Sequence, residues 1–437
     1  MRNSAIHHAH EEGIANRGFI ALLLTMACGA LNDNLYRGAL MLLVVTGSAW
    51  GGVLGSGGTG WVTLMVYVPF LLLLGFTGLL SDRYPKYRII VLTRFVEIIL
   101  ASLVILAMFM DSPWFAFLLL LLLASQSAFF SPAKYGSVPE VVSPGNLSRA
   151  NGVLSLLTNA CIVAGLSLSG ILLDYGTSIG IKGTIFVGIV MTAIATFSFL
   201  ITFMIPRTPA ARPDLKISIN GFKTYWRTFG DIRKTPLMTA VMAWCLFYLV
   251  ASLIIVIIPE YRQPLELTDG QVSYLLGSAT LGVALGGGIV GVLSGHSIVV
   301  RFIPIGSIGM TVGFFILGMF QLPYLWILVL LGLIGLAAGV YVVPILALLQ
   351  HMPVPGFRAR CLGTANFACY VAMSLSAGLY GLLAIQVGSH PETWFLITAI
   401  MAAVISISLL FMMPSLSRGA RPESFSTVHD REEHGTA

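Results

Sequence analysis

Charged side chains lie inside long apolar segments at two places in this 437-residue chain. Asp33 and Arg37 are four residues apart, which puts them on one face of a helix, and Arg94 and Glu97, three residues apart, are neighbours in the same way. An ionised side chain deep in a membrane costs roughly 2.5–3.5 kcal/mol on insertion scales, so such residues usually line a substrate or ion pathway. Each pair also has a structural interpretation, in which one charge neutralises the other.

The segments around these pairs have the composition of membrane-spanning helices. Charged residues make up 10% of the chain against a usual ~25%, hydrophobic residues make up 57%, and the mean hydropathy is +0.90. These values exclude an ordinary soluble enzyme and a largely disordered chain. Twelve stretches are long enough to span a ~30 Å hydrocarbon core, at residues 17–45, 59–80, 88–110, 113–137, 149–173, 183–205, 237–259, 270–293, 298–319, 324–350, 361–386 and 391–413.

The distribution of basic residues predicts the orientation of these helices. Of the 24 Lys and Arg, 19 lie in the termini and the even-numbered connections, and only Lys182 and Arg262 lie in the odd-numbered ones. By the positive-inside rule both termini are cytoplasmic, residues 51–59 are outside and residues 207–234 are inside. The net charge of +6 then reflects a basic cytoplasmic face against anionic lipid and does not indicate nucleic-acid binding.

Short motifs of the first half recur in the second half at nearly one offset. The second half repeats Gly78-Leu-Leu-Ser-Asp-Arg83 as Gly291-Val-Leu-Ser-Gly-His296, and Ser131-Pro132 as Val343-Pro344. The repeat predicts two parallel six-helix bundles, the arrangement expected of major facilitator transporters. The predicted parts are a cytoplasmic tail at 1–16, bundles at 17–205 and 237–413, a cytoplasmic linker with an interfacial helix at 206–236, and a cytoplasmic tail at 414–437.

The loop after the second predicted helix carries a glycine, an Asp-Arg pair and two further basic residues. This pattern resembles the cytoplasmic signature of the major facilitator superfamily. Charges at cytoplasmic helix ends favour a conformational latch between the halves over a substrate site. The second copy has Gly295 and His296 in place of the charges, so we expect an asymmetric latch. The predicted latch consists of Gly78, Asp82, Arg83, Lys86 and Arg88.

A narrower resemblance rests on four blocks that follow in order along the chain. The blocks are Gly29-Ala-Leu-Asn-Asp33-Asn34-Leu-Tyr-Arg37, Arg94-Phe-Val-Glu97, Phe130-Ser-Pro132-Ala-Lys134-Tyr135-Gly136, and the run from Val343 through Gln350, His351, Arg358 and Arg360 to Asn366. Together they resemble the lysophospholipid transporter family, including the transporter half of bifunctional proteins that fuse it to an acyltransferase and an acyl carrier protein synthetase. The resemblance implies a flippase that moves lysophospholipids from the outer to the inner leaflet of a bacterial cytoplasmic membrane for re-acylation.

The acyltransferase half of the fused proteins is not expected in this chain. No His-x-x-x-x-Asp pattern occurs at any of the eight histidines. The resemblance therefore implies a possible partner acyltransferase that is encoded separately, with membrane lipid and lysophospholipid as the other partners.

The resemblance also implies which side chains bind the substrate. A lysophosphatidylethanolamine headgroup needs an anion for its ammonium, here Asp33, and cations for its phosphate, here Arg37, while its acyl chain needs an apolar groove. Lys134 belongs to the same blocks, although a lysine near a helix end can simply extend to the lipid headgroups. The predicted substrate-binding residues are Asp33, Asn34, Arg37, Arg94, Glu97, Lys134, Tyr341 and Asn366. Gln126, Tyr341 and other polar or aromatic residues are cavity candidates with packing as the alternative.

Two other functions are alternatives to a lipid flippase. The main alternative is a major facilitator exporter of amphiphilic drugs or small metabolites, with Asp33 or Glu97 carrying a coupled proton. A membrane-embedded acyltransferase or hydrolase lacks any GxSxG, HExxH or Cys/His constellation, so no enzyme activity is predicted. The five cysteines form no CxxC, and His7, His8 and His10 fall in the polar N-terminal tail, so we predict no metal site and no cofactor. The chain is expected to be a monomer.

Overall fold

The computed structural model describes residues 16–45, 47–143, 147–210, 213–214, 221–294, 298–353, 358–388 and 390–419. Within them, 12 helices are long and apolar enough to cross a membrane. They coincide with the twelve predicted spans, so the all-α membrane fold expected from the sequence is confirmed. The predicted polar tails at both ends of the chain, with His7, His8 and His10, lie outside the described residues.

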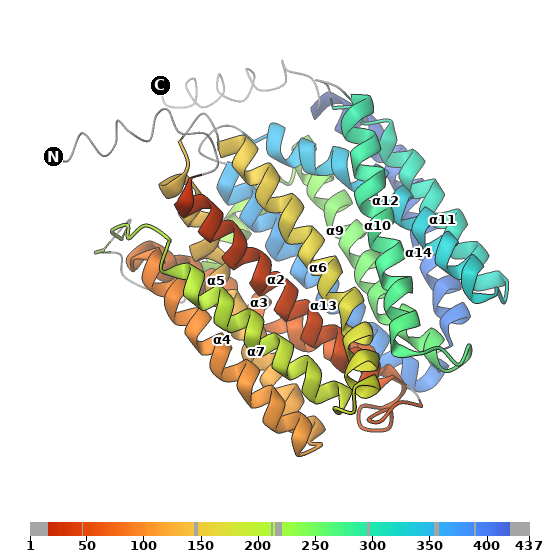
Figure 1. Cartoon of the computed structure of the whole chain (residues 1–437). Helices are drawn as coiled ribbons and strands as arrows, with labels where there is room; N and C mark the ends of the chain where they lie inside the picture. The colour runs from red at the N-terminus through yellow and green to blue at the C-terminus, as the bar shows by residue number, and fades with distance from the viewer. Residues whose placement is uncertain are drawn as a thin grey trace, which may run out of the picture. The chain divides into compact units, whose positions relative to one another are not determined.

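The first unit holds six spans and reaches to Gly221, with Arg262–Gly277 added to it. In it α2 packs against α6 and α7, α4 packs against α5 and α7, and α3 packs against α5 (Figure 1). Phe19, Leu22, Met26, Ile90 and Phe130 belong to a buried apolar cluster near one end of this unit. Its spans are α2 (Arg17–Val44), α3 (Gly58–Arg83), α4 (Lys86–Phe109), α5 (Pro113–Val141), α6 (Leu147–Ser178) and α7 (Gly183–Thr202).

The second unit comprises the described residues of Phe222–Tyr261 and Ser278–Ala437. In it α9 packs against α12, α13 and α14, and α11 packs against α12 and α14 (Figure 1). Its helices are α8 (Gly221–Ile232), α9 (Pro236–Ile257), α11 (Phe302–Met319), α12 (Tyr324–His351), α13 (Arg358–Val387) and α14 (Pro391–Gly419). The helix α10 (Asp269–Ser294) begins in the first unit and belongs to the second from Ser278 onward. The helix expected within the linker is α8.

Several helices are longer than the apolar stretches that predict them. The stretch at 113–137 becomes α5, which continues through Pro139 to Val141, and the stretch at 391–413 becomes α14, which ends at Gly419. Hydropathy detects only the part of a helix that suits hydrocarbon, whereas the backbone hydrogen bonds continue into the polar interface.

One end of the first unit is held together through Asp111, between α4 and α5. The Asp111 carboxylate accepts a hydrogen bond from Trp50 Nε1 at 3.1 Å and pairs with Lys182 Nζ at 3.2 Å. These hydrogen bonds, first that of Lys182 and then that of Trp50, lower the pKa of Asp111 below its usual value. Three connections predicted to lie outside therefore meet at one carboxylate.

The first turns of α10 pack closely against α6 inside the first unit. Gly170 N–H donates to Ser273 Oγ at 2.9 Å, and Gly270 N–H donates to Asp174 Oδ2 at 2.8 Å. A Cβ on Gly170 would overlap the Asp269 carbonyl, so only glycine permits this approach. The Asp174 carboxylate also lies at the positive N-terminal end of α10, where a negative charge is stabilising.

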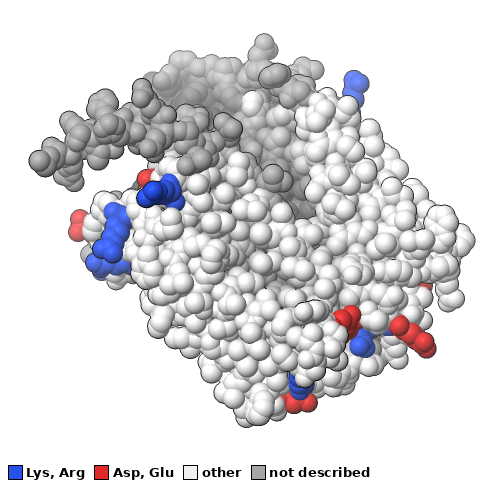
Figure 2. Space-filling model, viewed as in Figure 1, with Lys and Arg blue, Asp and Glu red and all other residues white. Residues whose placement is uncertain are grey.

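The outer surface is that of a protein dissolved in lipid. Figure 2 shows a face whose visible atoms are mostly uncharged, with Lys, Arg, Asp and Glu near its margins. Large apolar side chains point outward, including Leu92, Val292 and Phe411 at 62%, 83% and 82% exposure. In water such a surface would drive aggregation, whereas acyl chains solvate it.

Candidate functional site

Asp33 lies at one end of a series of polar contacts that joins α2, α5 and α4. The Ser127 hydroxyl donates to Asp33 Oδ2 at 2.6 Å and lies 3.1 Å from Gln126 Oε1. Gln126 Nε2 in turn donates to the Thr93 carbonyl at 2.8 Å. Asp33 is half-buried, so its carboxylate is held by a hydroxyl while part of the side chain stays accessible.

Arg94 and Glu97 form an ion pair within α4, and both side chains are buried, at 0% and 1% exposure. Asn32 Nδ2 donates to Glu97 Oε1 at 3.0 Å and to the Met191 carbonyl at 3.0 Å. The pair is therefore tied to α2 and, through Asn32, to α7. The ion pair agrees with the structural interpretation of Arg94 and Glu97, in which one charge neutralises the other.

Much of the hydrogen-bonding capacity of Arg94 is nevertheless unused. Arg94 Cζ lies 4.0 Å from the centroid of the Phe130 ring, and a Cβ on Gly29 would lie 2.5 Å from Arg94 Nη1. Arg94 Nη1 pairs with Glu97 Oε2, and within the described residues neither Nε nor Nη2 has a hydrogen-bond partner. Buried guanidinium N–H groups are normally satisfied, so this side chain is suited to an anionic ligand.

Arg37 is one turn beyond Asp33 and binds α3 instead of Asp33. Arg37 Nη2 donates to the Tyr67 hydroxyl at 3.0 Å and to Thr63 Oγ1 at 3.3 Å, and its Cζ lies 5.0 Å from the centroid of the Tyr67 ring. Among the ion pairs of the described residues, none joins Asp33 to Arg37. The two side chains do not neutralise each other, contrary to the structural alternative for this pair.

Lys134 and Asn34 complete the predicted residues of the first unit. Lys134 Nζ lies 5.4 Å from the centroid of the Phe130 ring, the same ring on which Arg94 rests, and 5.0 Å from that of Tyr135. Two cations, Arg94 and Lys134, therefore lie near one aromatic ring. Asn34 Nδ2 instead donates to the Ala30 carbonyl of its own helix, at 2.9 Å.

Tyr341 and Asn366 belong to the second unit. Tyr341 is fully buried, its hydroxyl donates to the Ala243 carbonyl at 2.9 Å, and its ring stacks on Phe247 with centroids 5.6 Å apart. These are the contacts of a packing residue. Asn366 is exposed on α13.

The predicted latch residues have different surroundings. Lys86 is buried and forms an ion pair with Glu140 of α5, which also accepts a hydrogen bond from the Thr208 hydroxyl. Arg83 Cζ lies 5.7 Å from the Tyr84 ring centroid. Asp82 and Gly78 are half-buried, Arg88 is exposed, and no ion pair of the described residues includes Asp82. Gly295 and His296 lie outside the described residues.

Several partners in these clusters were not predicted as site residues. Asn32 and Ser127 hold the two carboxylates, Tyr67 and Thr63 hold Arg37, and Glu140 holds Lys86. Asn32 adjoins Asp33 and Ser127 adjoins Gln126. A polar residue next to a predicted one inside an apolar helix was the sequence feature that could have identified them. No group of three potential metal ligands occurs among the described residues, and the five cysteines are free thiols.

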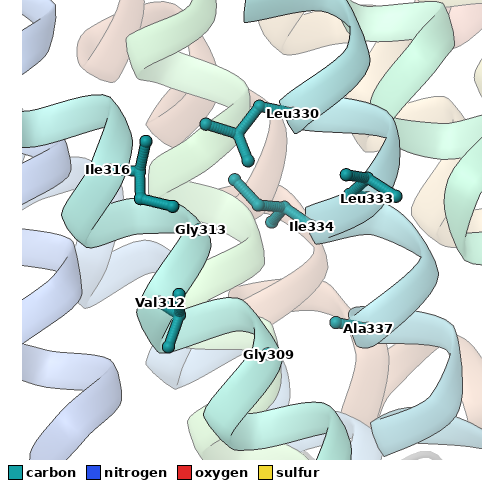
Figure 3. Close-up of a pocket in the computed structure, with 8 residues that line it drawn as sticks. All are labelled: Gly309, Val312, Gly313, Ile316, Leu330, Leu333, Ile334 and Ala337. Carbon is teal, nitrogen blue, oxygen red and sulfur yellow. The ribbon is translucent and has the colours of Figure 1, made fainter. Parts of the chain in front are cut away.

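An apolar groove of about 270 Å³ lies between α11 and α12 in the second unit (Figure 3). Every lining residue is apolar, so the groove offers no chemistry for a headgroup. Val312 and Leu333 are more than half exposed, at 52% and 56%, so the groove belongs to the outer surface. The residues that line it are Gly309, Val312, Gly313, Ile316, Leu330, Leu333, Ile334 and Ala337.

Comparisons with known proteins agree with this architecture. The family model described as Major Facilitator Superfamily matches residues 22–377 and 245–429. Lysophospholipid transporter LplT of Enterobacter sp. (strain 638) is 28% identical over 73% of this chain and 78% of its own length, and LplT of Cronobacter sakazakii is 27% identical over 84% and 89%. These relatives are transporters and indicate no enzyme family.

Solved structures share the fold at low identity. A bacterial homolog of the human lysosomal transporter Spinster, inward-facing and unoccupied, superposes with a TM-score of 0.69 at 14% identity over 94% of this chain and all of that chain. A POT family transporter in complex with a thioalcohol-conjugated peptide superposes with a TM-score of 0.68 at 13% identity over 92% and 96%.

Proposed function

Since this chain belongs to the Major Facilitator Superfamily, and is a secondary transporter of that type, we propose that its substrate is a lysophospholipid. The names of its curated relatives support this substrate, and so does the polar chemistry inside the first unit. The observation that carries the proposal is Arg94, a fully buried guanidinium that pairs with Glu97 and whose Nε and Nη2 have no hydrogen-bond partner among the described residues.

The charges of the first unit suit a zwitterionic headgroup. Arg94 offers a planar fork of donors that matches a phosphate, and Lys134 adds a second cation beyond Phe130. Asp33 is half-buried and offers a carboxylate for the ammonium. Glu97 neutralises Arg94 when no phosphate is bound, and Arg37 is a further cation on the same helix as Asp33.

The direction of transport follows from the family resemblance. We propose movement from the outer to the inner leaflet of a bacterial cytoplasmic membrane, by alternation of the two six-helix bundles, with both termini in the cytoplasm. A separately encoded acyltransferase would then restore the second acyl chain. A single-chain lipid fits this cycle because only one apolar tail must accompany the headgroup.

Reconstitution into vesicles tests the substrate. Fluorescent lysophosphatidylethanolamine is added outside, and the fraction protected from albumin extraction is followed, with the diacyl lipid as comparison. The wild type should protect the single-chain lipid much faster. Arg94→Lys keeps the charge opposite Glu97 but loses the planar fork, so it should slow transport roughly ten-fold or more, consistent with one charged hydrogen bond. Arg301→Gln, which changes an exposed cation outside the first unit, serves as the control and should not slow transport.

The proton-coupled exporter remains the second candidate because Asp33 and Glu97 are carboxylates inside spans. Vesicles that fail to take up lysophospholipid but expel an amphiphilic cation when a proton gradient is applied would establish it in place of the flippase.

A further inference from the structure

The helix α8 is fixed against α13 by one of its faces. Tyr225 stacks on Phe367 of α13 with ring centroids 4.5 Å apart and rings 11° from parallel. Arg360 Nη2 donates to Asp231 Oδ2 at 3.1 Å, and Ile232 is buried. These contacts join α8 to the first turns of α13.

The other face of α8, continued by the turn that follows Ile232, carries one tryptophan and three cations. Trp226, Arg227, Gly230, Arg233 and Lys234 follow the spacing i, i+1, i+4, i+7 and i+8 of a single helical face, and all five are exposed. Trp226 is exposed to 71%. The ion pairs of the described residues include none of the three cations, whereas the carboxylate of the helix, Asp231, is paired with Arg360. This face therefore carries an aromatic ring and three positive charges that no ion pair of the described residues neutralises.

The connections of α8 set its level relative to the membrane. Lys234 lies two residues before Pro236, which is the first residue of the span Pro236–Arg262. Asp231 contacts Arg360, the first residue of the span Arg360–Val387. The exposed face of α8 therefore lies where two spans begin, at the boundary between hydrocarbon and water.

Anionic phospholipid headgroups are the abundant anions of that boundary, and tryptophan prefers the same depth. The cations of α8 are spread over about two helical turns, which suits a surface of several headgroups better than one small anion. We propose that this face, formed by Trp226, Arg227, Arg233 and Lys234, binds the headgroups of anionic phospholipids. Through Tyr225 and Asp231 the bound lipid surface would hold the start of α13.

Full-length protein in phosphatidylcholine nanodiscs provides the test, with brominated phosphatidylglycerol as the probe. Quenching of Trp226 reports binding, and Trp226→Phe gives the background of the other tryptophans. A cation near an anionic surface contributes roughly a fivefold gain in affinity, so Arg233→Gln should weaken binding about fivefold. The triple variant Arg227→Gln, Arg233→Gln and Lys234→Gln should weaken it further.

Arg301→Gln is the matched control, because Arg301 is another exposed cation predicted to be cytoplasmic. It should leave quenching of Trp226 unchanged. The proposal is overturned if Arg301→Gln and Arg233→Gln have equal effects, or if brominated phosphatidylcholine quenches Trp226 as strongly. Displacement of the lipid by inorganic phosphate would also overturn it, in favour of a small-anion site.

Discussion

Asp33 and Arg37 lie one turn apart on α2, yet Asp33 is bound by Ser127 of α5 and Arg37 by Tyr67 of α3. The two charged groups thus have different hydrogen-bond partners and do not form an ion pair with each other. This separation leaves a carboxylate and a guanidinium to act on different parts of one ligand.

Asp33→Asn keeps the shape of the side chain and removes its charge. If the carboxylate accepts the ammonium of the headgroup, binding of lysophosphatidylethanolamine should weaken by roughly 1.5–3 kcal/mol, about ten- to over a hundred-fold. Lysophosphatidylglycerol, which has no cation at that place, should be less affected. Equal losses for the two lipids, measured by equilibrium binding, would assign Asp33 to the fold or to a coupled proton.

Arg94 and Glu97 should show strong energetic coupling. Arg94→Gln or Glu97→Gln leaves a buried charge without its partner, which costs about 3–5 kcal/mol, whereas the double neutral variant should recover much of that loss. The measurement is a double-mutant cycle on the free energy of unfolding in micelles. The pair Asp33→Asn and Arg37→Gln is the comparison, and its smaller coupling energy should reflect the absence of a direct contact.

Asp82→Asn should slow transport and leave substrate affinity within a few-fold, because a latch acts on conformations and not on the ligand. Lys86→Gln should behave differently, since its ion pair with Glu140 lies within the first unit and its loss should lower stability. Transport rate, equilibrium binding and thermal unfolding on both variants separate the two roles. A large loss of binding in Asp82→Asn would contradict the latch.

Cysteine labelling checks the predicted orientation. Gly52→Cys adds a side chain into open space in the connection predicted to be outside. Arg301→Cys places one at the start of α11, a helix end predicted to be inside. An impermeant maleimide added to whole cells should modify the first and not the second. The wild type, with its five free thiols, gives the background. Modification of both from the same side would overturn the topology.

The Asp111 contact should make stability depend on pH in one direction. Because the folded protein lowers the pKa of Asp111, the contact stabilises the fold above the unfolded pKa of about 3.9, and this stability is lost as pH falls through the lower folded value. The difference in unfolding midpoint between wild type and Asp111→Asn should therefore be constant near neutral pH and vanish in acid. The effect should be small, since Asp111 and Lys182 are 62% and 46% exposed. If the difference in unfolding midpoint grew as the pH fell, the prediction would be contradicted.

The sequence predicted the spans because twenty apolar residues in a row satisfy a bilayer whatever their neighbours are. It also predicted which charged residues lie inside the protein, because a charged residue within an apolar run must lie inside a span. It did not predict their partners, because whether Asp33 meets Arg37 or Ser127 depends on how each helix is rotated about its axis. Glu140 illustrates the limit, since nothing near it in the sequence points to Lys86, more than fifty residues away.

Residues Arg262–Gly277 are translated after α9 but pack as part of the first unit. When synthesis has reached the end of α7, the first unit is therefore still incomplete. The hydrogen bonds of α6 with Gly270 and Ser273 can form only after the start of α10 has been translated. A chain cut in the linker would give a first fragment without these partners. We therefore expect a first half expressed alone to be less stable than the same half expressed together with the second.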